Sequence, residues 1–215
     1  CKPIGRTSCY GWRQPQIASM ESVTLHNIRI ITVSGRIASG STTLAKKLAQ
    51  VLVWKHVEGG EIFWEAVRKK MNLSPEQTNL RPDEEDELFD KKLKDMLQRE
   101  KNIVLETKLA GFNAQGVEGI FKVLVLCEDK DGNDKTEIRI DRLLAREHMS
   151  LTEAKEEVLT REKNDIEKWQ RLYAPDDPNW TYWDKKYYDL VINTYSSNPY
   201  EALVAVLQAV KKGVI

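Results

Sequence analysis

Short apolar stretches alternate with longer charged stretches along most of this chain. The apolar stretches are rich in β-branched residues and show no alternation with polar ones, which is typical of strands buried on both faces. Four are clear and a fifth, at 53–57, is compatible with a short strand; the clear ones lie at 28–34 (IRIITVS), 102–107 (NIVLET), 121–127 (FKVLVLC) and 188–194 (YDLVINT). The pattern therefore predicts a five-stranded parallel sheet.

The segments between these runs have helical periodicity. In 42–53, apolar residues recur at Leu44, Leu48, Val51 and Leu52. Further helices are predicted at 61–71, 83–100, 138–147, 152–172 and 199–212. Strands that alternate with helices predict an α/β fold with helices on both faces of the sheet. The blocks around 58–100 and 135–172 are too polar to be core, so we expect them to be insertions that project from the sheet.

Composition restricts the class of protein. The chain has 215 residues with 33 basic and 33 acidic side chains, and this neutrality argues against a dedicated nucleic-acid binder. No apolar run approaches the roughly 20 residues that a bilayer span needs. Three scattered cysteines suit a reducing compartment better than a disulfide scaffold. Residues 1–27 have no periodicity, so we interpret them as a disordered extension of a cytoplasmic protein, with one domain at 28–215.

A glycine-containing loop follows the first predicted strand and opens a helix. It reads GRIASGST from Gly35 to Thr42. Backbone N–H groups in such a loop converge on an anion, and the helix N-terminus adds positive partial charge. Gly35 and Gly40 have the spacing of a phosphate-binding P-loop, and Thr42 lies where a hydroxyl would reach Mg²⁺. The departure is Ser41, where that motif has lysine, and the loss is worth about 3 kcal/mol of transition-state stabilisation.

The alternative is a glycine turn that joins strand to helix without a ligand. One N-cap residue would suffice for such a turn. This segment instead carries a dense group of hydroxyls at Ser39, Ser41, Thr42 and Thr43, which favours a wrapped phosphate. We therefore expect phosphate binding by Gly35, Arg36, Ala38, Ser39, Gly40, Ser41, Thr42 and Thr43, with Arg36 as one candidate to replace the missing cation.

Four segments resemble, in order and spacing, the archaeal-type cytidylate kinases of the P-loop nucleoside monophosphate kinase family. They are 61–74 (EIFWEAVRKKMNLS), 102–112 (NIVLETKLAGF), 139–165 (RIDRLLAREHMSLTEAKEEVLTREKND) and 188–194 (YDLVINT). Some members of this family have Thr or Ser in place of the P-loop lysine. The resemblance covers nearly everything after residue 28. It implies a monophosphate-binding insertion at 58–100 and a lid at 135–172.

The resemblance implies roles on the acceptor side of the site. Glu106 matches the acidic residue that orders Mg²⁺ through water, as expected of a carboxylate at a strand end near phosphates. Lys108 stands where the family usually has an arginine for the acceptor phosphate, so it keeps the charge without the bidentate fork. Trp64 also replaces an arginine, and Arg68, one turn later on the same face, is the candidate substitute. Glu61, which opens this segment, is assigned to the acceptor site as well.

Arginines recur along the predicted lid. Arg139, Arg142 and Arg146 stand at i, i+3 and i+7, which places three guanidiniums along one helical face, and Arg161 follows on the return helix. In the family, matching arginines close over the donor phosphates and neutralise the charge that develops there. The alternative is a solvated basic face paired with neighbouring carboxylates.

The reaction that the resemblance implies is phosphoryl transfer from Mg·ATP to CMP or dCMP, in pyrimidine nucleotide metabolism. The partners would be ATP, Mg²⁺ and the acceptor nucleotide, with no nucleic acid and no membrane, and we expect a monomer. Two alternatives stay open. The chain could phosphorylate another nucleoside monophosphate, because the departures at Trp64 and Lys108 fall on the acceptor side. It could also be a catalytically weak nucleotide-binding module, which Ser41 favours.

Overall fold

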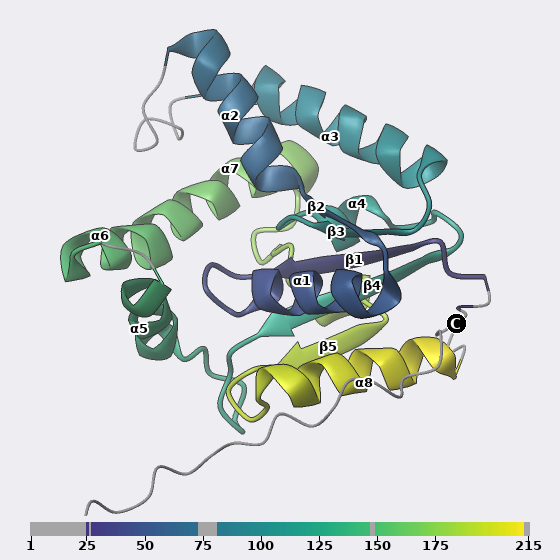
Figure 1. Ribbon diagram of the computed structural model, residues 1–215. Helices are drawn as coiled ribbons and strands as arrows, with labels where there is room; N and C mark the ends of the chain where they lie inside the picture. Colours follow the sequence, from purple (N-terminus) through teal and green to yellow (C-terminus); the bar gives the residue numbers. More distant parts are fainter. Residues whose placement is uncertain (1–24, 26, 73–80, 147–148, 213–215) are drawn as a thin grey trace, which may run out of the picture.

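The computed structural model describes residues 25, 27–72, 81–146 and 149–212, apart from the side chains of residues 61, 62 and 64. Five parallel strands form one sheet in the order β2-β3-β1-β4-β5 (Figure 1). The strands are β1 (Ile30–Gly35), β2 (Lys55–Glu58), β3 (Ile103–Glu106), β4 (Ile120–Leu126) and β5 (Leu190–Asn193). The predicted five-stranded parallel sheet is therefore confirmed. The extension expected at 1–27 and the side chains of Glu61 and Trp64 lie outside the described residues, except for residues 25 and 27.

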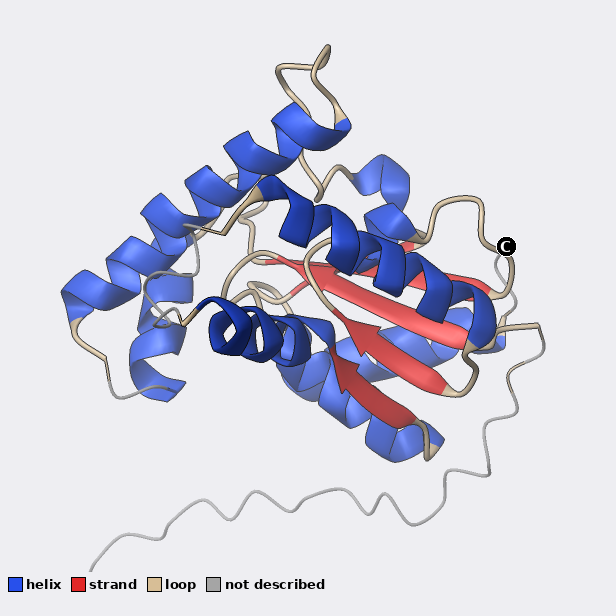
Figure 2. Cartoon of the chain, turned by 90° about the horizontal axis from the view of Figure 1, so that it is seen from above, coloured by secondary structure: helices blue, strands red, loops and turns tan. Residues whose placement is uncertain are grey.

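Helices cover both faces of the sheet, as Figure 2 shows from above. On one face, α1 (Ser41–Leu52) and α8 (Pro199–Lys211) bury an apolar cluster against the sheet. On the other face, α3 (Asp83–Arg99) and the short α4 (Ala110–Asn113) bury a second cluster. Ile30 belongs to the second cluster and Ile31 to the first, because successive side chains of a strand point to opposite faces. This two-sided burial explains why β1 is apolar at nearly every position.

Two groups of helices extend beyond the sheet at the carboxyl ends of its strands (Figure 1). One consists of α2 (Gly59–Met71) and the adjoining α3. The other consists of α5 (Thr136–Arg146), α6 (Leu151–Lys155), the π-helical turn η3 (Glu156–Arg161) and α7 (Glu162–Tyr173). We call residues 136–173 the lid. The helix expected at 152–172 thus contains a π-helical turn, a feature that is frequent at functional sites.

A small apolar cluster attaches the lid to the first loop. Leu143 of α5 and Val158 of η3 are buried in it, and Ile37 and Ala38 of the loop pack against them. The lid is therefore amphipathic, with one apolar stripe toward the loop and charged residues elsewhere. No helix in the described part of the chain has both the length and the apolar character that a membrane span requires.

A buried carboxylate joins the two helical groups behind the sheet. Asp90 of α3 is only 5% exposed and accepts hydrogen bonds from Asn113 Nδ2 at 3.0 Å and from the Tyr173 hydroxyl at the end of α7. Burial raises the pKa of Asp90 from 3.8 to about 6, although both hydrogen bonds and Lys94 oppose the rise. The nearby charge of Asp86 raises it further.

This carboxylate should make the stability of the fold depend on pH. The folded pKa lies above the unfolded value, so the contribution of Asp90 is complete below pH 4 and is lost as the pH rises through 6. We expect Asp90→Asn to abolish that loss, which amounts to about 3 kcal/mol between pH 4 and 7. The difference in unfolding free energy between variant and parent, measured by urea titration at each pH, should shift by that amount in favour of the variant. The exposed carboxylate of Asp95 on the same helix provides the control, Asp95→Asn; a pH-independent difference for Asp90→Asn would contradict the assignment.

Candidate active site

The loop between β1 and α1 is shaped by two glycines. A Cβ at Gly35 would lie 2.4 Å from Ser39 Oγ and 3.0 Å from the Val125 carbonyl oxygen, so the close turn excludes a side chain. Gly40 is the N-cap of α1 and has a φ of +106°, in the left-handed region that favours glycine. The loop therefore winds tightly into the N-terminus of a 12-residue helix, which is a suitable geometry for an anion.

Two hydroxyls at the start of α1 converge on one carboxylate. Ser41 Oγ and Thr42 Oγ1 donate hydrogen bonds to Glu106 Oε1 at 3.0 and 2.7 Å. Glu106 is the last residue of β3 and pairs in register with Val33 of β1, two residues before the loop begins. The sheet thus places this acidic residue at the base of the loop, as the sequence predicted a strand-end carboxylate would lie.

A cavity of about 390 Å³ begins at this loop and extends between the lid and the β5–α8 connection. Residues 38 and 40–44 form its loop end, and Ala145, Arg142 and Arg146 form its lid side. The third side is formed by Thr194, Ser197, Pro199 and Ala202. Hydroxyls and arginines therefore lie at one end and along one wall, with small apolar side chains at the far end. Such a lining suits an elongated ligand with an anionic end and a flat apolar end.

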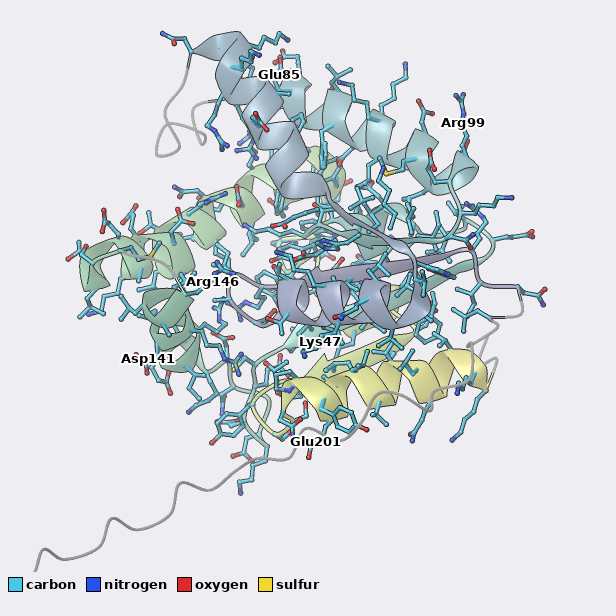
Figure 3. All side chains as sticks on the ribbon, in the orientation of Figure 1. Lys47, Glu85, Arg99, Asp141, Arg146 and Glu201 are labelled. Carbon is cyan, nitrogen blue, oxygen red and sulfur yellow. The ribbon has the colours of Figure 1, made fainter. Side chains whose placement is uncertain are left out.

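Arg142 joins the lid to the loop and to the β5–α8 connection at one end of this cavity. Its Nη1 donates to the Ser39 carbonyl oxygen at 3.2 Å and to Thr194 Oγ1 at 2.8 Å, and its Nη2 donates to the Thr194 carbonyl oxygen at 2.9 Å. Thr194 Oγ1 in turn donates to the Ser39 carbonyl at 2.6 Å, so Thr194 lies directly against the loop. Arg142 therefore ties α5 to both segments, while Arg146, one turn further along α5, lies on the side of the lid that faces the loop (Figure 3).

Arg139 has a different position, although it stands on the same predicted stripe. Its guanidinium is 1% exposed and donates to Asp134 at 2.8 Å, to Glu162 at 3.0 Å and to the Ile37 carbonyl oxygen at 2.8 Å. Arg36 pairs with the same two carboxylates and stacks 4.4 Å over the Trp183 ring. The structure thus makes both arginines part of the junction between loop and lid.

Glu162 lies at the centre of that junction. Burial by itself would raise its pKa, but the hydrogen bonds and charges of Arg36 and Arg139 outweigh burial and lower the pKa. The same carboxylate accepts a hydrogen bond from the Ile37 backbone N–H at 3.2 Å. Glu162 therefore stays ionised and bonds the first turn of α7 to the loop through Arg36 and Ile37 and to α5 through Arg139.

On the opposite side of the loop, cations face carboxylates between α3 and α7. Lys108 Nζ lies 2.6 Å from Asp165 Oδ2 and 5.6 Å from the centre of the Trp169 ring. Burial would raise the pKa of Asp165, but Lys108, Arg161 and Arg81 together lower it. These charges line the space between the two helical groups, where the sequence places the acceptor.

The remaining predicted residues lie at the edges of this region. Arg161 Nη1 pairs with Glu157 at 2.6 Å, four residues earlier on the same helix, and Arg68 is half-buried in the last turn of α2. Thr43 lies at the mouth of the cavity, next to Thr42. The structure thus brings the loop, Arg142 and Arg146 together around the cavity, with Glu106 bonded to the hydroxyls of the loop, and it places Lys108 beside Asp165 of the lid.

Several residues of the site carry no motif that sequence reasoning could use. Arg81 is one of them; it is buried and pairs with Asp86 at 2.8 Å. Thr194 is predicted only as the last residue of a strand, with no role in the site. His56 and Glu58 also lie outside any motif, because the segment at 53–57 predicts only a short strand. The one signal was position, since Glu58 and Thr194 both follow apolar runs at the predicted carboxyl edge of the sheet.

Comparison with known proteins agrees with this geometry. A family model described as "AAA domain" matches residues 34–171. A protein of Haloarcula marismortui named cytidylate kinase is 32% identical over 85% of this chain and 89% of its own length. Another of that name, from Archaeoglobus fulgidus, is 31% identical over 84% of this chain and 94% of its own.

Solved structures extend the likeness at the level of the fold. Shikimate kinase from Acinetobacter baumannii, solved with shikimate, has a TM-score of 0.55 at 13% identity and covers 86% of this chain and 94% of its own. An uncharacterised protein from Eubacterium ventriosum has a TM-score of 0.58 at 17% identity. The match covers 85% of this chain and 98% of the other. The fold is thus that of P-loop kinases. The sequence relationship is narrower, and by it the chain belongs to the P-loop nucleoside monophosphate kinase family, within the archaeal-type cytidylate kinase branch.

Proposed function

We propose that this protein transfers the γ-phosphoryl group of Mg·ATP to a nucleoside monophosphate, with CMP and dCMP as the preferred acceptors. The observation that carries the proposal is the cavity that begins at the hydroxyl-rich loop and is walled by Arg142 and Arg146. The end of the cavity that is lined by hydroxyls and arginines suits the triphosphate. The other end, at Pro199 and Ala202, suits the adenine ring. The relatives named cytidylate kinase support the choice of acceptor.

The residues at the base of the loop fit a magnesium ion. Mg²⁺ prefers oxygen ligands and retains several waters. The hydroxyl of Thr42 lies at the start of α1, and the Glu106 carboxylate accepts its hydrogen bond at 2.7 Å. Thr42 would hold the ion directly and Glu106 would order its waters. When bound, Mg²⁺ neutralises charge on the β- and γ-phosphates.

The chain's own part in the reaction is to position the two nucleotides and to neutralise the charge on their phosphates. The acceptor phosphate oxygen attacks the γ-phosphorus in line with the leaving oxygen, and no covalent enzyme intermediate is needed. Arg142 ties the lid to the loop and to Thr194 at the edge of the donor cavity, and Arg146 lies on the lid face that would close over the transferring group. Lys108 would meet the acceptor phosphate on the other side by exchanging Asp165 for it. Packing of the lid on Ile37 and Ala38 excludes water from the loop.

Arg36 and Arg139 have a positioning role in this proposal. Their guanidiniums are held by Asp134 and Glu162 at the junction of loop and lid, so they would act on the phosphates only through the loop backbone. Ser41 donates to Glu106 and leaves the lysine position of the P-loop without a charge. This feature keeps a second candidate function open, a nucleotide-binding module with weak catalysis.

The acceptor can be tested by measuring ADP formation from Mg·ATP with CMP, dCMP, UMP, AMP and GMP. We expect rapid turnover with CMP and dCMP, and kcat/KM at least tenfold lower with the others. Turnover confined to another acceptor would support the proposed reaction but reject CMP and dCMP as its acceptors. Absence of turnover with all five, from folded protein that still binds ATP, would favour the binding module.

The role of Arg146 can be separated from simple ATP binding. A charge donor that acts in the transition state contributes about 10²- to 10³-fold to turnover. We therefore expect Arg146→Ala to lower kcat about 100-fold, while the dissociation constant for ATP, measured calorimetrically, changes less than tenfold. Arg171→Ala is the matched control, because Arg171 lies in α7 and pairs with Asp83 at the protein surface. Equal losses in kcat and ATP affinity, or no loss in either, would exclude this role.

A further inference from the structure

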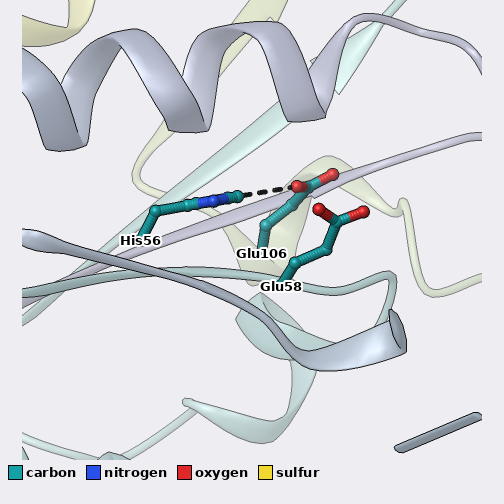
Figure 4. A group of neighbouring side chains, drawn as sticks. All are labelled: His56, Glu58 and Glu106. Atoms are coloured by element: carbon teal, nitrogen blue, oxygen red, sulfur yellow. Dashed lines mark ion pairs between the residues drawn. The ribbon is translucent and has the colours of Figure 1, made fainter. Parts of the chain in front are cut away.

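Three potential metal ligands face one another beside the phosphate loop. His56 and Glu58 are two residues apart on β2, so their side chains point to the same face of the sheet. Glu58 pairs in register with Glu106 of β3, which brings the second carboxylate to the same face. Figure 4 shows the imidazole and the two carboxylates converging from these neighbouring strands. The cluster is thus a direct consequence of strand register.

The spacing of these groups fits a common ion. One ligand atom from each of His56, Glu58 and Glu106 lies within 4.8 Å of the others. His56 Nε2 lies 3.4 Å from Glu106 Oε2. Two ligand atoms bound at about 2.1 Å from a tetrahedral ion are themselves about 3.4 Å apart. The observed separation suits two ligands of one metal; it is also an ion-pair distance and is longer than the usual hydrogen bond.

Two of the atoms that face the cluster's centre lack hydrogen-bond partners. Among the described residues, neither His56 Nε2 nor Glu106 Oε2 makes a hydrogen bond, although both atoms are buried. Glu106 is 8% exposed, and its other oxygen, Oε1, is already occupied by the hydroxyls of Ser41 and Thr42. Buried polar atoms without a partner are costly and call for an explanation such as an ion.

One lysine approaches the cluster from its exposed side. Lys46 Nζ lies 3.8 Å from Glu58 Oε2, but the Lys46 side chain is 61% exposed and such a pair contributes little. Two carboxylates and one imidazole form a donor set that suits a divalent cation.

We propose that His56, Glu58 and Glu106 bind one divalent transition-metal ion, such as Zn²⁺, Mn²⁺ or Co²⁺. An imidazole ligand favours these ions over Mg²⁺ and Ca²⁺, which prefer oxygen. Three protein ligands leave at least one coordination position open toward water or a ligand. This site uses Glu106 Oε2, whereas Oε1 faces the hydroxyls at the start of α1, so it differs from the magnesium position.

The ion would lie next to the position that lacks lysine. Ser41 Oγ is bonded to the same carboxylate at 3.0 Å, so a metal on Glu106 brings positive charge close to residue 41. Only this consequence rests on the proposed function, since it assumes that ATP phosphates occupy the loop. Binding of the metal itself depends solely on the three side chains.

The test uses the full chain, stripped with chelator and free of nucleotide, and titrated with Co²⁺. We expect one equivalent to bind, with visible absorption bands of a four- or five-coordinate ion and persistence in millimolar Mg²⁺. His56→Ala and Glu58→Gln should each weaken Co²⁺ binding at least tenfold. Glu118→Gln, the same chemical change on an exposed residue before β4, should leave binding unchanged.

Three outcomes would overturn the proposal: no Co²⁺ binding by the parent, binding that His56→Ala leaves intact, or a spectrum unaffected by Glu58→Gln. His56→Gln serves as the second variant if circular dichroism shows that His56→Ala does not fold. Because the titration contains no nucleotide, its result is independent of the acceptor panel. A kinase without Co²⁺ binding would reject this site alone, and Co²⁺ binding without turnover would reject only the proposed reaction.

Discussion

β2 and β3 end at the same level, two residues before the end of the neighbouring β1, and the site depends on that register. Val33 of β1 pairs with Glu106 of β3, and Glu106 pairs in turn with Glu58 of β2. The phosphate loop starts two residues after Val33, so its hydroxyls meet Glu106 without any long side chain having to reach across. A one-residue shift of β3 would turn Glu106 to the opposite face of the sheet. The apolar residues that fix this register are therefore as important for the site as the polar residues that form it.

Buried charge pairs give the lid its position in the absence of nucleotide. Glu162 is held by Arg36 and Arg139, and Asp165 is held by Lys108, all with little access to water. Removing one partner of such a pair costs about 3–5 kcal/mol, whereas exchanging one anion for another costs much less. In the proposed reaction the acceptor phosphate would take the place of Asp165 on Lys108, because it brings its own charge. The Glu162 junction has no such exchange available, since both of its arginines are buried against the loop, so it would persist as a fixed hinge point.

The architecture could be predicted from sequence because a strand that is buried on both faces has a recognisable run of apolar and β-branched residues. β1 and β4 are buried at nearly every position and are rich in β-branched and aliphatic residues, and Gly35 follows from a turn that has no room for a Cβ. β2 was the weakest prediction for a physical reason: it lies at the sheet edge and only Val57 is buried, since His56 and Glu58 face the site. β2 contributes two polar side chains to the site, and for that reason its apolar sequence pattern is the weakest of the five strands.

Side-chain partners could not be predicted in the same way. Arg139 and Arg142 lie three residues apart on one stripe, yet Arg139 is buried against Asp134 and Glu162, whereas Arg142 bonds to Thr194 and Ser39 at the cavity wall. Periodicity gives the face of a helix but not what packs against it. The pairing of Lys168 with Asp86 joins residues 82 positions apart and depends on how α3 and α7 approach each other. Such contacts become visible only once the helices are placed.

The serine at position 41 and the carboxylates on β2 and β3 are best understood as parts of one electrostatic arrangement. A lysine at residue 41 would lie beside Glu106, because Ser41 Oγ already contacts it, and would neutralise that carboxylate. With serine there, residue 41 adds no positive charge beside Glu106 and the neighbouring Glu58, close to where the proposed function places the phosphates. Two carboxylates near a polyphosphate are repulsive unless a cation lies between them. The loss of lysine therefore increases the need for metal at this edge of the sheet, and the imidazole of His56 provides a ligand suited to holding it.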